Sequence, residues 1–177
     1  MPTSEEIIKH LNLQKHPEGG YFSETFRSRE TTADPLRGNR AYSTAIYYML
    51  TANTFSEMHR LITDEIFHFY LGDPVEMLHL YPDGTGKRVI LGTDITQGML
   101  PQVLVPAGVW QGSRLFPGGK NPGKNRGKNE DKNGYALMGT TMAPAFEYSD
   151  YLSGDRTELI RQYPEFKDLI IALTRKG

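Results

Sequence analysis

Two short stretches carry polar residues at a spacing from which one buried site could be built. In "HRLITDEIFHFYLG" the pattern is His59-x-Leu61-x3-Glu65-x6-Gly72, and farther along "PAGVWQ" ends in Gln111. An imidazole, a carboxylate and an amide can bind a divalent ion, bind a polar organic molecule, or bond one another in a buried network. The pattern therefore predicts a site at His59, Glu65 and Gln111 and leaves these three uses open.

Strand alternation favours one of these uses. If His59 faces the interior of a sheet, Leu61 does so too, and from Glu65 the same period of two sends aromatic side chains inward. A catalytic metal needs at least three good donors, whereas a polar cluster beside an apolar wall suits an organic ligand. We therefore predict catalytic roles for His59 and Glu65, with a divalent metal on His59, Glu65 and Gln111 as the alternative. The predicted ligand-binding residues here are Gln111, Phe67 and Phe69.

Trp110, the one tryptophan of the chain, directly precedes Gln111. Its ring could stack on a ligand, and we include it among the predicted ligand-binding residues. The alternative is that the ring fills the core.

The stretch "HPEGGYFSETFRS", residues 16–28, combines a histidine, carboxylates and aromatics. Adjacent glycines would let the chain turn into a sheet. Alternation predicts that Phe22, Glu24 and Phe26 share the buried face, with Arg27 outside. We predict that this strand forms the rim of a pocket, with Tyr21 and Glu24 as ligand-contacting residues.

The elements that must position these residues are mostly strands. About ten short runs rich in β-branched and aromatic residues are separated by Gly, Pro, Asp and Asn, which predicts an all-β sandwich, jelly roll or barrel. "YPDGTGK" predicts a hairpin turn. Thr3 and Glu6 form a capping box for an N-terminal helix, and two helices are expected after Asp155.

Composition narrows the class of protein. The chain has 177 residues, a formal charge of −1 and no cysteine, which predicts a single domain over residues 1–177 without disulfides or thiolate metal sites. The near-zero charge argues against nucleic acid as a partner. We find no run of ~20 apolar residues that would span a membrane. We expect a cytoplasmic protein.

Residues 116–134 do not fit a packed scaffold, because they consist mainly of Gly, Asn, Lys and Pro. A basic arm that touches phosphates is one interpretation. We favour a flexible basic loop inserted between two strands, since no aromatic residues interleave the charges.

The two spacings resemble the paired motifs of the cupin superfamily. His59, Glu65, Gly72, Pro106 and Gly108 match. Five other motif positions, where the superfamily has glycine, histidine or asparagine, hold Asn53, Leu61, Leu100, Gln111 and Leu115 in this chain. More closely, "HPEGGYFSETFRS", "DEIFHFYLGDP", "VPAGVWQ" and "APAFEYSDYLSGDRTELIRQYPE" resemble the cupin 5 group, formerly DUF985. The resemblance implies a double-stranded β-helix (a jelly-roll barrel) with N- and C-terminal helices, an interior pocket and a homodimer.

Three functions follow as hypotheses. The first is binding of a small polar molecule inside the barrel, such as a sugar or nucleotide-sugar. The resemblance to the cupins also implies that the protein could catalyse an isomerase- or epimerase-like reaction, in which His59 would act as a base. The second is a metal-dependent enzyme using His59 and Glu65. The third is a ligand-binding or storage-type protein without turnover.

Overall fold

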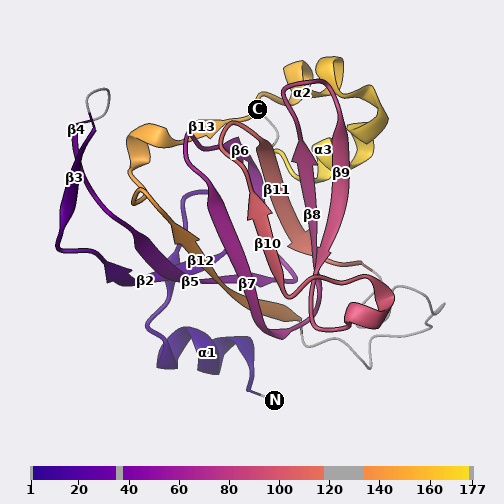
Figure 1. The fold of residues 1–177 in the computed structure, drawn as a ribbon. Coiled ribbons are helices and arrows are strands. Elements are labelled where there is room, and N and C mark those ends of the chain that lie inside the picture. Colours follow the sequence, from indigo (N-terminus) through magenta and orange to yellow (C-terminus); the bar gives the residue numbers. More distant parts are fainter. Residues whose placement is uncertain (1, 35–37, 118–133, 176–177) are drawn as a thin grey trace.

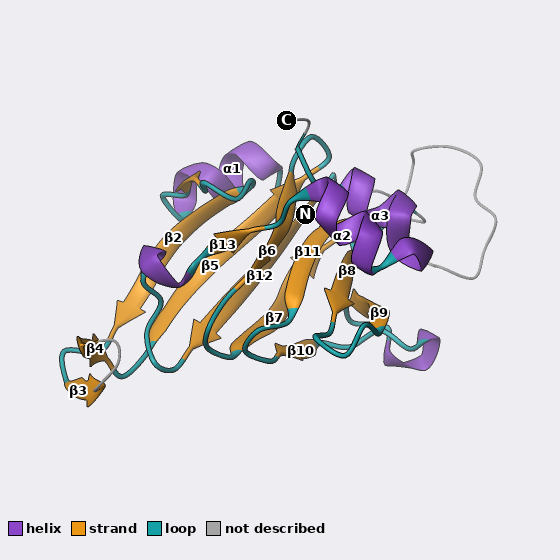
Figure 2. Cartoon of the chain, turned by 90° about the horizontal axis from the view of Figure 1, so that it is seen from above, coloured by secondary structure: helices purple, strands orange, loops and turns teal. Residues whose placement is uncertain are grey.

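The computed structural model describes residues 2–34, 38–117 and 134–175, and within them the chain folds into two antiparallel sheets that face each other (Figures 1 and 2). The six-stranded sheet has the order β1-β2-β5-β12-β7-β10, the five-stranded sheet has the order β13-β6-β11-β8-β9, and β3 and β4 form a separate hairpin. The six-stranded sheet consists of β1 (Gln14–Lys15), β2 (Tyr21–Arg27), β5 (Thr44–Thr51), β12 (Tyr135–Met142), β7 (Glu65–Gly72) and β10 (Gln102–Val105). The remaining strands are β13 (Leu152–Ser153), β6 (Phe55–Arg60), β11 (Trp110–Leu115), β8 (Val75–Leu80), β9 (Gly86–Leu91), β3 (Thr31–Asp34) and β4 (Gly38–Ala41).

The core lies between the two sheets, because each strand turns alternate side chains inward. Tyr48 and Leu50 on β5, Phe67 on β7 and Met77 on β8 belong to this buried cluster. The predicted jelly-roll fold is confirmed, and so is the hairpin turn, where the amide of Thr85 donates to Asp83 between β8 and β9.

Helices cover the outer faces of the sheets, as Figure 2 shows. Helix α1 (Ser4–His10) begins at the predicted capping box, in which the Thr3 side chain accepts from the amide of Glu6. It packs Ile7 on one half of the six-stranded sheet. The short helices η1 (Ile95–Gln97), η3 (Tyr148–Asp150) and η4 (Pro164–Phe166) lie in connections. The two C-terminal helices, α2 (Arg156–Gln162) and α3 (Lys167–Ala172), cover the five-stranded sheet.

Strand β2 departs from the predicted alternation. The register between β2 and β5 shifts between Glu24 and Phe26, which is a β-bulge. Because a bulge inserts one residue, it reverses the faces beyond it. The prediction that Phe26 is buried and Arg27 lies outside is therefore wrong: Phe26 is 52% exposed, and Arg27 lines the interior cavity together with Glu24.

Residues 118–133, which make up most of the predicted loop insertion at 116–134, lie outside the described residues. In the part of the chain that the structure describes, no helix is long and apolar enough to cross a membrane.

Candidate functional site

A cavity of about 340 Å³ opens between the two sheets. This volume is near the lower end of the range for small-molecule pockets. The lining residues fall into three groups. The polar interior group is His16, Glu18, Ser56, Glu65 and Thr140. The wall is Phe22, Ile46, Tyr48, Leu61, Phe67 and Met142, and the mouth is Glu24, Arg27, Thr44, Phe146, Glu147 and Tyr148.

The three residues predicted from the motif spacing meet at the inner end of this cavity. Gln111 on β11 lies directly opposite His59 on β6. The side-chain amide of Gln111 donates to Oε2 of Glu65, on the facing sheet, at 2.8 Å. All three side chains are buried, but only Glu65 is a lining residue of the cavity. His59 and Gln111 therefore support the inner end rather than forming its surface.

Glu18 separates His59 from the cavity, and the sequence analysis missed it. Its Oε2 lies 3.5 Å from Nε2 of His59. Nδ1 of His59 lies 2.7 Å from the carbonyl oxygen of Glu57; because a carbonyl only accepts, Nδ1 carries the proton and Nε2 presents its lone pair to Glu18. Burial, and secondarily the charge of Glu57, raise the pKa of Glu18 to about 8.

The backbone next to Glu18 explains the paired glycines of "HPEGGYF". Gly19 has a φ of +115°, and a Cβ there would lie 1.9 Å from the carbonyl oxygen of Phe55. The hydroxyl of Tyr48 donates to the carbonyl oxygen of Gly19 at 2.8 Å, and the amide of Glu57 donates to the carbonyl of Glu18. The turn is thus pressed against β6 and held from two sides, which fixes the Glu18 backbone beside His59. A glutamate followed by two glycines was the signal that could have identified this residue.

His16 completes the inner polar group. Its Nδ1 accepts a hydrogen bond from the amide of Glu18 at 3.2 Å, and its ring packs edge-on against Phe22 and Tyr48. Burial, and secondarily the proximity of His59, lower the pKa of His16 to about 4. Burial also lowers the pKa of His59. Both imidazoles are therefore neutral at pH 7.

Tyr151 supports the ring of His59 by stacking on it. The two rings are stacked, with centroids 5.2 Å apart and planes at 26°. The Tyr151 hydroxyl donates to a carboxylate oxygen of Glu57 at 2.7 Å. Together with the Glu57 carbonyl, this stacking fixes the orientation of the His59 ring.

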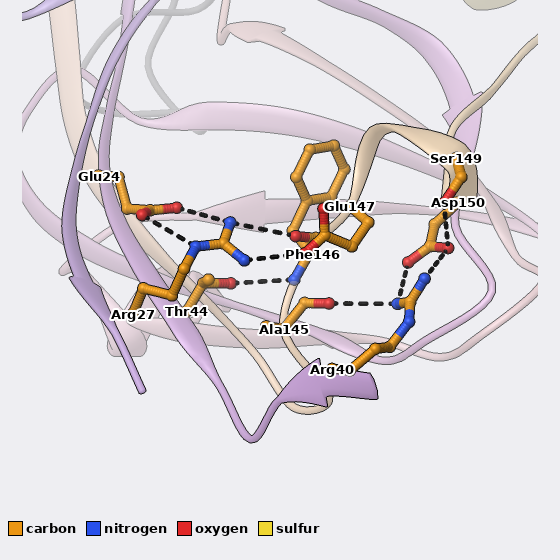
Figure 3. A network of polar contacts seen from close by, with 9 residues as sticks. All are labelled: Glu24, Arg27, Arg40, Thr44, Ala145, Phe146, Glu147, Ser149 and Asp150. Carbon is orange, nitrogen blue, oxygen red and sulfur yellow. Dashed lines mark hydrogen bonds and ion pairs between the residues drawn. The ribbon is translucent and has the colours of Figure 1, made fainter. Parts of the chain in front are cut away.

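The mouth of the cavity is crossed by residues 143–151, which we call the strap. Arg27 donates to Glu24, to Glu147 at 3.0 Å and to the carbonyl oxygen of Phe146 at 3.2 Å (Figure 3). Farther along the strap, Arg40 forms a buried ion pair with Asp150 and donates to the carbonyl oxygen of Ala145. These two arginines attach the strap to β2 and β4.

The structure places three predicted ligand-binding residues away from the cavity lining. Trp110 packs with the C-terminal helices on the outer face of the five-stranded sheet, with the Arg60 guanidinium 4.7 Å from its ring. Tyr21 lies in the cluster under α1, also on an outer face. Phe69 does point inward but packs against the core between the sheets. Glu24 and Phe67, in contrast, line the cavity as predicted.

The donor set does not fit a metal ion. In the described ranges of the chain, no group of three or more histidine, aspartate or glutamate side chains is arranged to hold an ion. Gln111 turns its amide nitrogen toward Glu65, Leu61 fills the place of a second imidazole, and Nε2 of His59 faces Glu18. Since a first-row metal needs three convergent donors, we derive no step through one.

Comparisons with known proteins agree with this architecture. A family model described as "Cupin superfamily (DUF985)" matches residues 5–153. An uncharacterized protein of Saccharomyces cerevisiae is 32% identical over 158 residues, which cover 83% of this chain and 73% of the yeast protein.

Among solved structures, a hypothetical protein from Leishmania major is 29% identical with a TM-score of 0.85, covering 99% of this chain and 100% of that one. A protein from Shewanella oneidensis is 30% identical with a TM-score of 0.83, covering both chains completely. Oxalate decarboxylase of Bacillus subtilis, which has Mn(II) centres, is 13% identical with a TM-score of 0.52 over 94% of this chain and 38% of its own. At that identity the likeness concerns the fold alone.

Proposed function

Because the chain belongs to the Cupin_5 family (DUF985) of the cupin superfamily, we propose that its cavity binds a small polar molecule and that Glu18 and His59 transfer a proton on it. One observation carries the proposal. The Glu18 carboxyl lines the cavity and lies 3.5 Å from a ring nitrogen of His59 that has its lone pair available.

The raised pKa of Glu18 supports a role in proton transfer. With a pKa of about 8, the carboxyl is mostly protonated at pH 7, yet roughly one molecule in ten is ionised. A group with its pKa near the working pH serves as both acid and base. Glu18 is the group that touches the ligand, and His59 is the partner that accepts or returns its proton.

The reaction class that suits this pair is proton abstraction next to a carbonyl group. The Glu18 carboxylate removes the proton from the carbon, and the C–H electron pair moves into a carbon–carbon double bond as the carbonyl oxygen becomes an enolate oxygen. When the Glu18 proton exchanges with solvent before Glu18 returns a proton to the same carbon, the substrate is regenerated with an exchanged hydrogen. Epimerisation and isomerisation of sugars both begin with this step.

The cavity wall supports a sugar-sized ligand. Phe22 and Phe67 offer aromatic rings to the C–H face of a sugar, and Ser56 and Thr140 offer hydroxyls. A volume of about 340 Å³ favours a single sugar ring over a nucleotide-linked sugar.

Hydrogen exchange tests the proposal. Sugars with a carbonyl group are incubated with the protein in D₂O, and loss of the C–H signal beside the carbonyl is followed by ¹H NMR. The intact protein should catalyse exchange, and Glu18→Gln and His59→Asn should each slow it by about 10² or more. Glu165→Gln, which removes a charge from the exposed surface, is the control. Exchange by Glu18→Gln at the rate of the intact protein would overturn the assignment. Binding of a sugar without exchange would favour the non-catalytic hypothesis.

For a protein partner we propose a second copy of the chain, which packs on the half of the six-stranded sheet that α1 leaves open. This open sheet face presents Tyr47, His68, Tyr70, Gln102 and Leu104, with no lysine, arginine or carboxylate among them. Tyr70 and Leu104 are 48% and 50% exposed. A two-fold contact through such a face brings no like charges together. We also propose a cytoplasmic location, since a chain without cysteine suits a reducing compartment.

A further inference from the structure

We infer that the ligand of this cavity carries a positively charged amino group, which lies between the carboxyl groups of Glu18 and Glu65 and against the aromatic wall. The inference rests on the proposed binding function and names the chemical class of the ligand. It follows from the distribution of charges in the cavity and from the rings beside them.

As far as the structure describes the chain, no cationic side chain lines the inner end of the cavity beside the two carboxyl groups. Among the described residues that line the cavity, Arg27 is the only arginine or lysine. It lies at the mouth and is already bonded to Glu24 and Glu147 (Figure 3). The mouth therefore has one guanidinium bonded to two carboxylates, whereas the inner end has two carboxyl groups and no permanent positive charge.

The partners of the inner carboxyl groups are all neutral. Glu65 accepts from the amide of Gln111, and Glu18 lies beside the imidazoles of His16 and His59. Burial lowers the pKa of both histidines, so neither is a cation at pH 7. Burial raises the pKa of both carboxyl groups, and the charge of Glu18 raises that of Glu65 further.

When no ligand is bound, a proton neutralises Glu18, and burial favours the neutral form of Glu65. An ammonium group is a better counter-charge, because it can donate to both carboxylates at once. The incoming charge would lower the pKa of Glu18 and convert it from an acid into a base. Binding of the cation would therefore prepare Glu18 for the proposed proton abstraction.

Aromatic rings provide the second and independent observation. Phe22, Tyr48 and Phe67 all line the same cavity, and aromatic faces attract cations at short range. Carboxylates combined with aromatic rings recognise an amino group, whereas an anionic ligand would meet Glu24 and Glu147 at the mouth and two more carboxyl groups inside. The described residues offer no set of three donors that would hold a metal ion instead.

Three sugars of similar size test the inference: D-glucosamine, which is cationic, D-glucose, which is neutral, and D-glucuronate, which is anionic. Their binding to the full chain is measured by titration calorimetry at pH 7. We expect glucosamine to bind at least tenfold more tightly than glucose, and glucuronate to bind more weakly than glucose. Glu65→Gln and Glu18→Gln should each reduce the preference for glucosamine to less than about threefold, and the surface control Glu165→Gln should leave it unchanged.

A second measurement covers the case in which a variant is poorly folded. In intact protein labelled with ¹³C at the glutamate carboxyls, glucosamine should move the Glu18 resonance to its ionised position at pH 7, and glucose should not. Equal binding of glucosamine and glucose would overturn the inference and leave the proposed function standing. Failure of all three sugars to bind would also overturn it, and hydrogen exchange would then decide the proposed function by its own readout.

Discussion

Replacing Glu18 by Gln should change how the stability of the protein depends on pH. The folded chain holds the pKa of Glu18 at about 8, against an ordinary value of 4.5. Between these two values the unfolded chain loses this proton while the folded chain keeps it. Stability must therefore fall as the pH rises toward 8, and then level off. Gln cannot ionise, so the variant lacks this contribution.

The histidines restrict the useful range of pH. Burial lowers the pKa of His16 and of His79 to about 4, against an ordinary value of 6.5. These residues make the folded state more stable as the pH rises from 4 to 6.5, which opposes the effect of Glu18. Above pH 6.5 the histidines are mostly neutral in both states. The range from pH 6.5 to 8 therefore isolates the buried carboxyl groups.

The size of the change in unfolding free energy follows from the raised pKa of Glu18. Each pH unit over which one proton is held by only the folded state changes the unfolding free energy by about 1.4 kcal/mol. Because Glu18 is half ionised by pH 8, its contribution between pH 6.5 and 8 is about 1.7 kcal/mol. The intact protein should lose about 1.7 kcal/mol more than Glu18→Gln does over this range. Comparison with the variant also removes the part of the Glu65 contribution that burial causes, because Glu65 is equally buried in both proteins.

The assay is urea unfolding at several pH values, followed by circular dichroism and by the fluorescence of Trp110, which packs beside the C-terminal helices. Glu165→Gln is the matched control and should follow the intact protein. If the unfolding free energies of the intact protein and of Glu18→Gln change in parallel, within about 0.5 kcal/mol, the carboxyl is ionised in the folded state and the reasoning about the cavity is wrong.

Three further predictions concern the elements around the site. Arg40→Ala leaves the buried carboxylate of Asp150 without its ion-pair partner, so it should lower the unfolding free energy by about 3–5 kcal/mol in urea titrations. Arg161→Ala breaks an exposed ion pair with Glu158 and should have no measurable effect. Gly19→Ala should destabilise the protein by at least about 2 kcal/mol more than Gly84→Ala. Both glycines have a positive φ, but only a Cβ at residue 19 would meet a backbone oxygen, at 1.9 Å. Equal destabilisation by the two substitutions would contradict the close packing at Gly19. Leu104→Glu should convert a dimer into a monomer in light-scattering measurements, and an unchanged mass would exclude the open sheet face as the dimer contact.

Much of the framework could be predicted from local patterns. The capping box at Thr3, the hairpin turn at Asp83 and the strand periods depend on neighbours a few residues apart, so they can be read from the chain alone. The placement of Trp110 was also within reach of this reasoning. Adjacent residues in a strand face opposite sides, so an inward Gln111 requires an outward Trp110.

The rest of the site depended on contacts between distant segments. The bulge in β2 turned Arg27 into the cavity, and local periodicity does not reveal where a bulge occurs. Glu18 lies in a turn, where alternation assigns no face, and its position is set by packing against β6.

The sequence by itself therefore determined an all-β framework and grouped His59, Glu65 and Gln111, because the period of two and the motif spacing are local properties. The resemblance to the cupins narrowed this framework to a jelly roll. Only the tertiary structure decided which groups touch a ligand. Residues 16–27, β6 and the strap are far apart along the chain and meet only after the strands pair. The raised pKa of Glu18 also arises only then, since it requires burial of the carboxyl near the charge of Glu57.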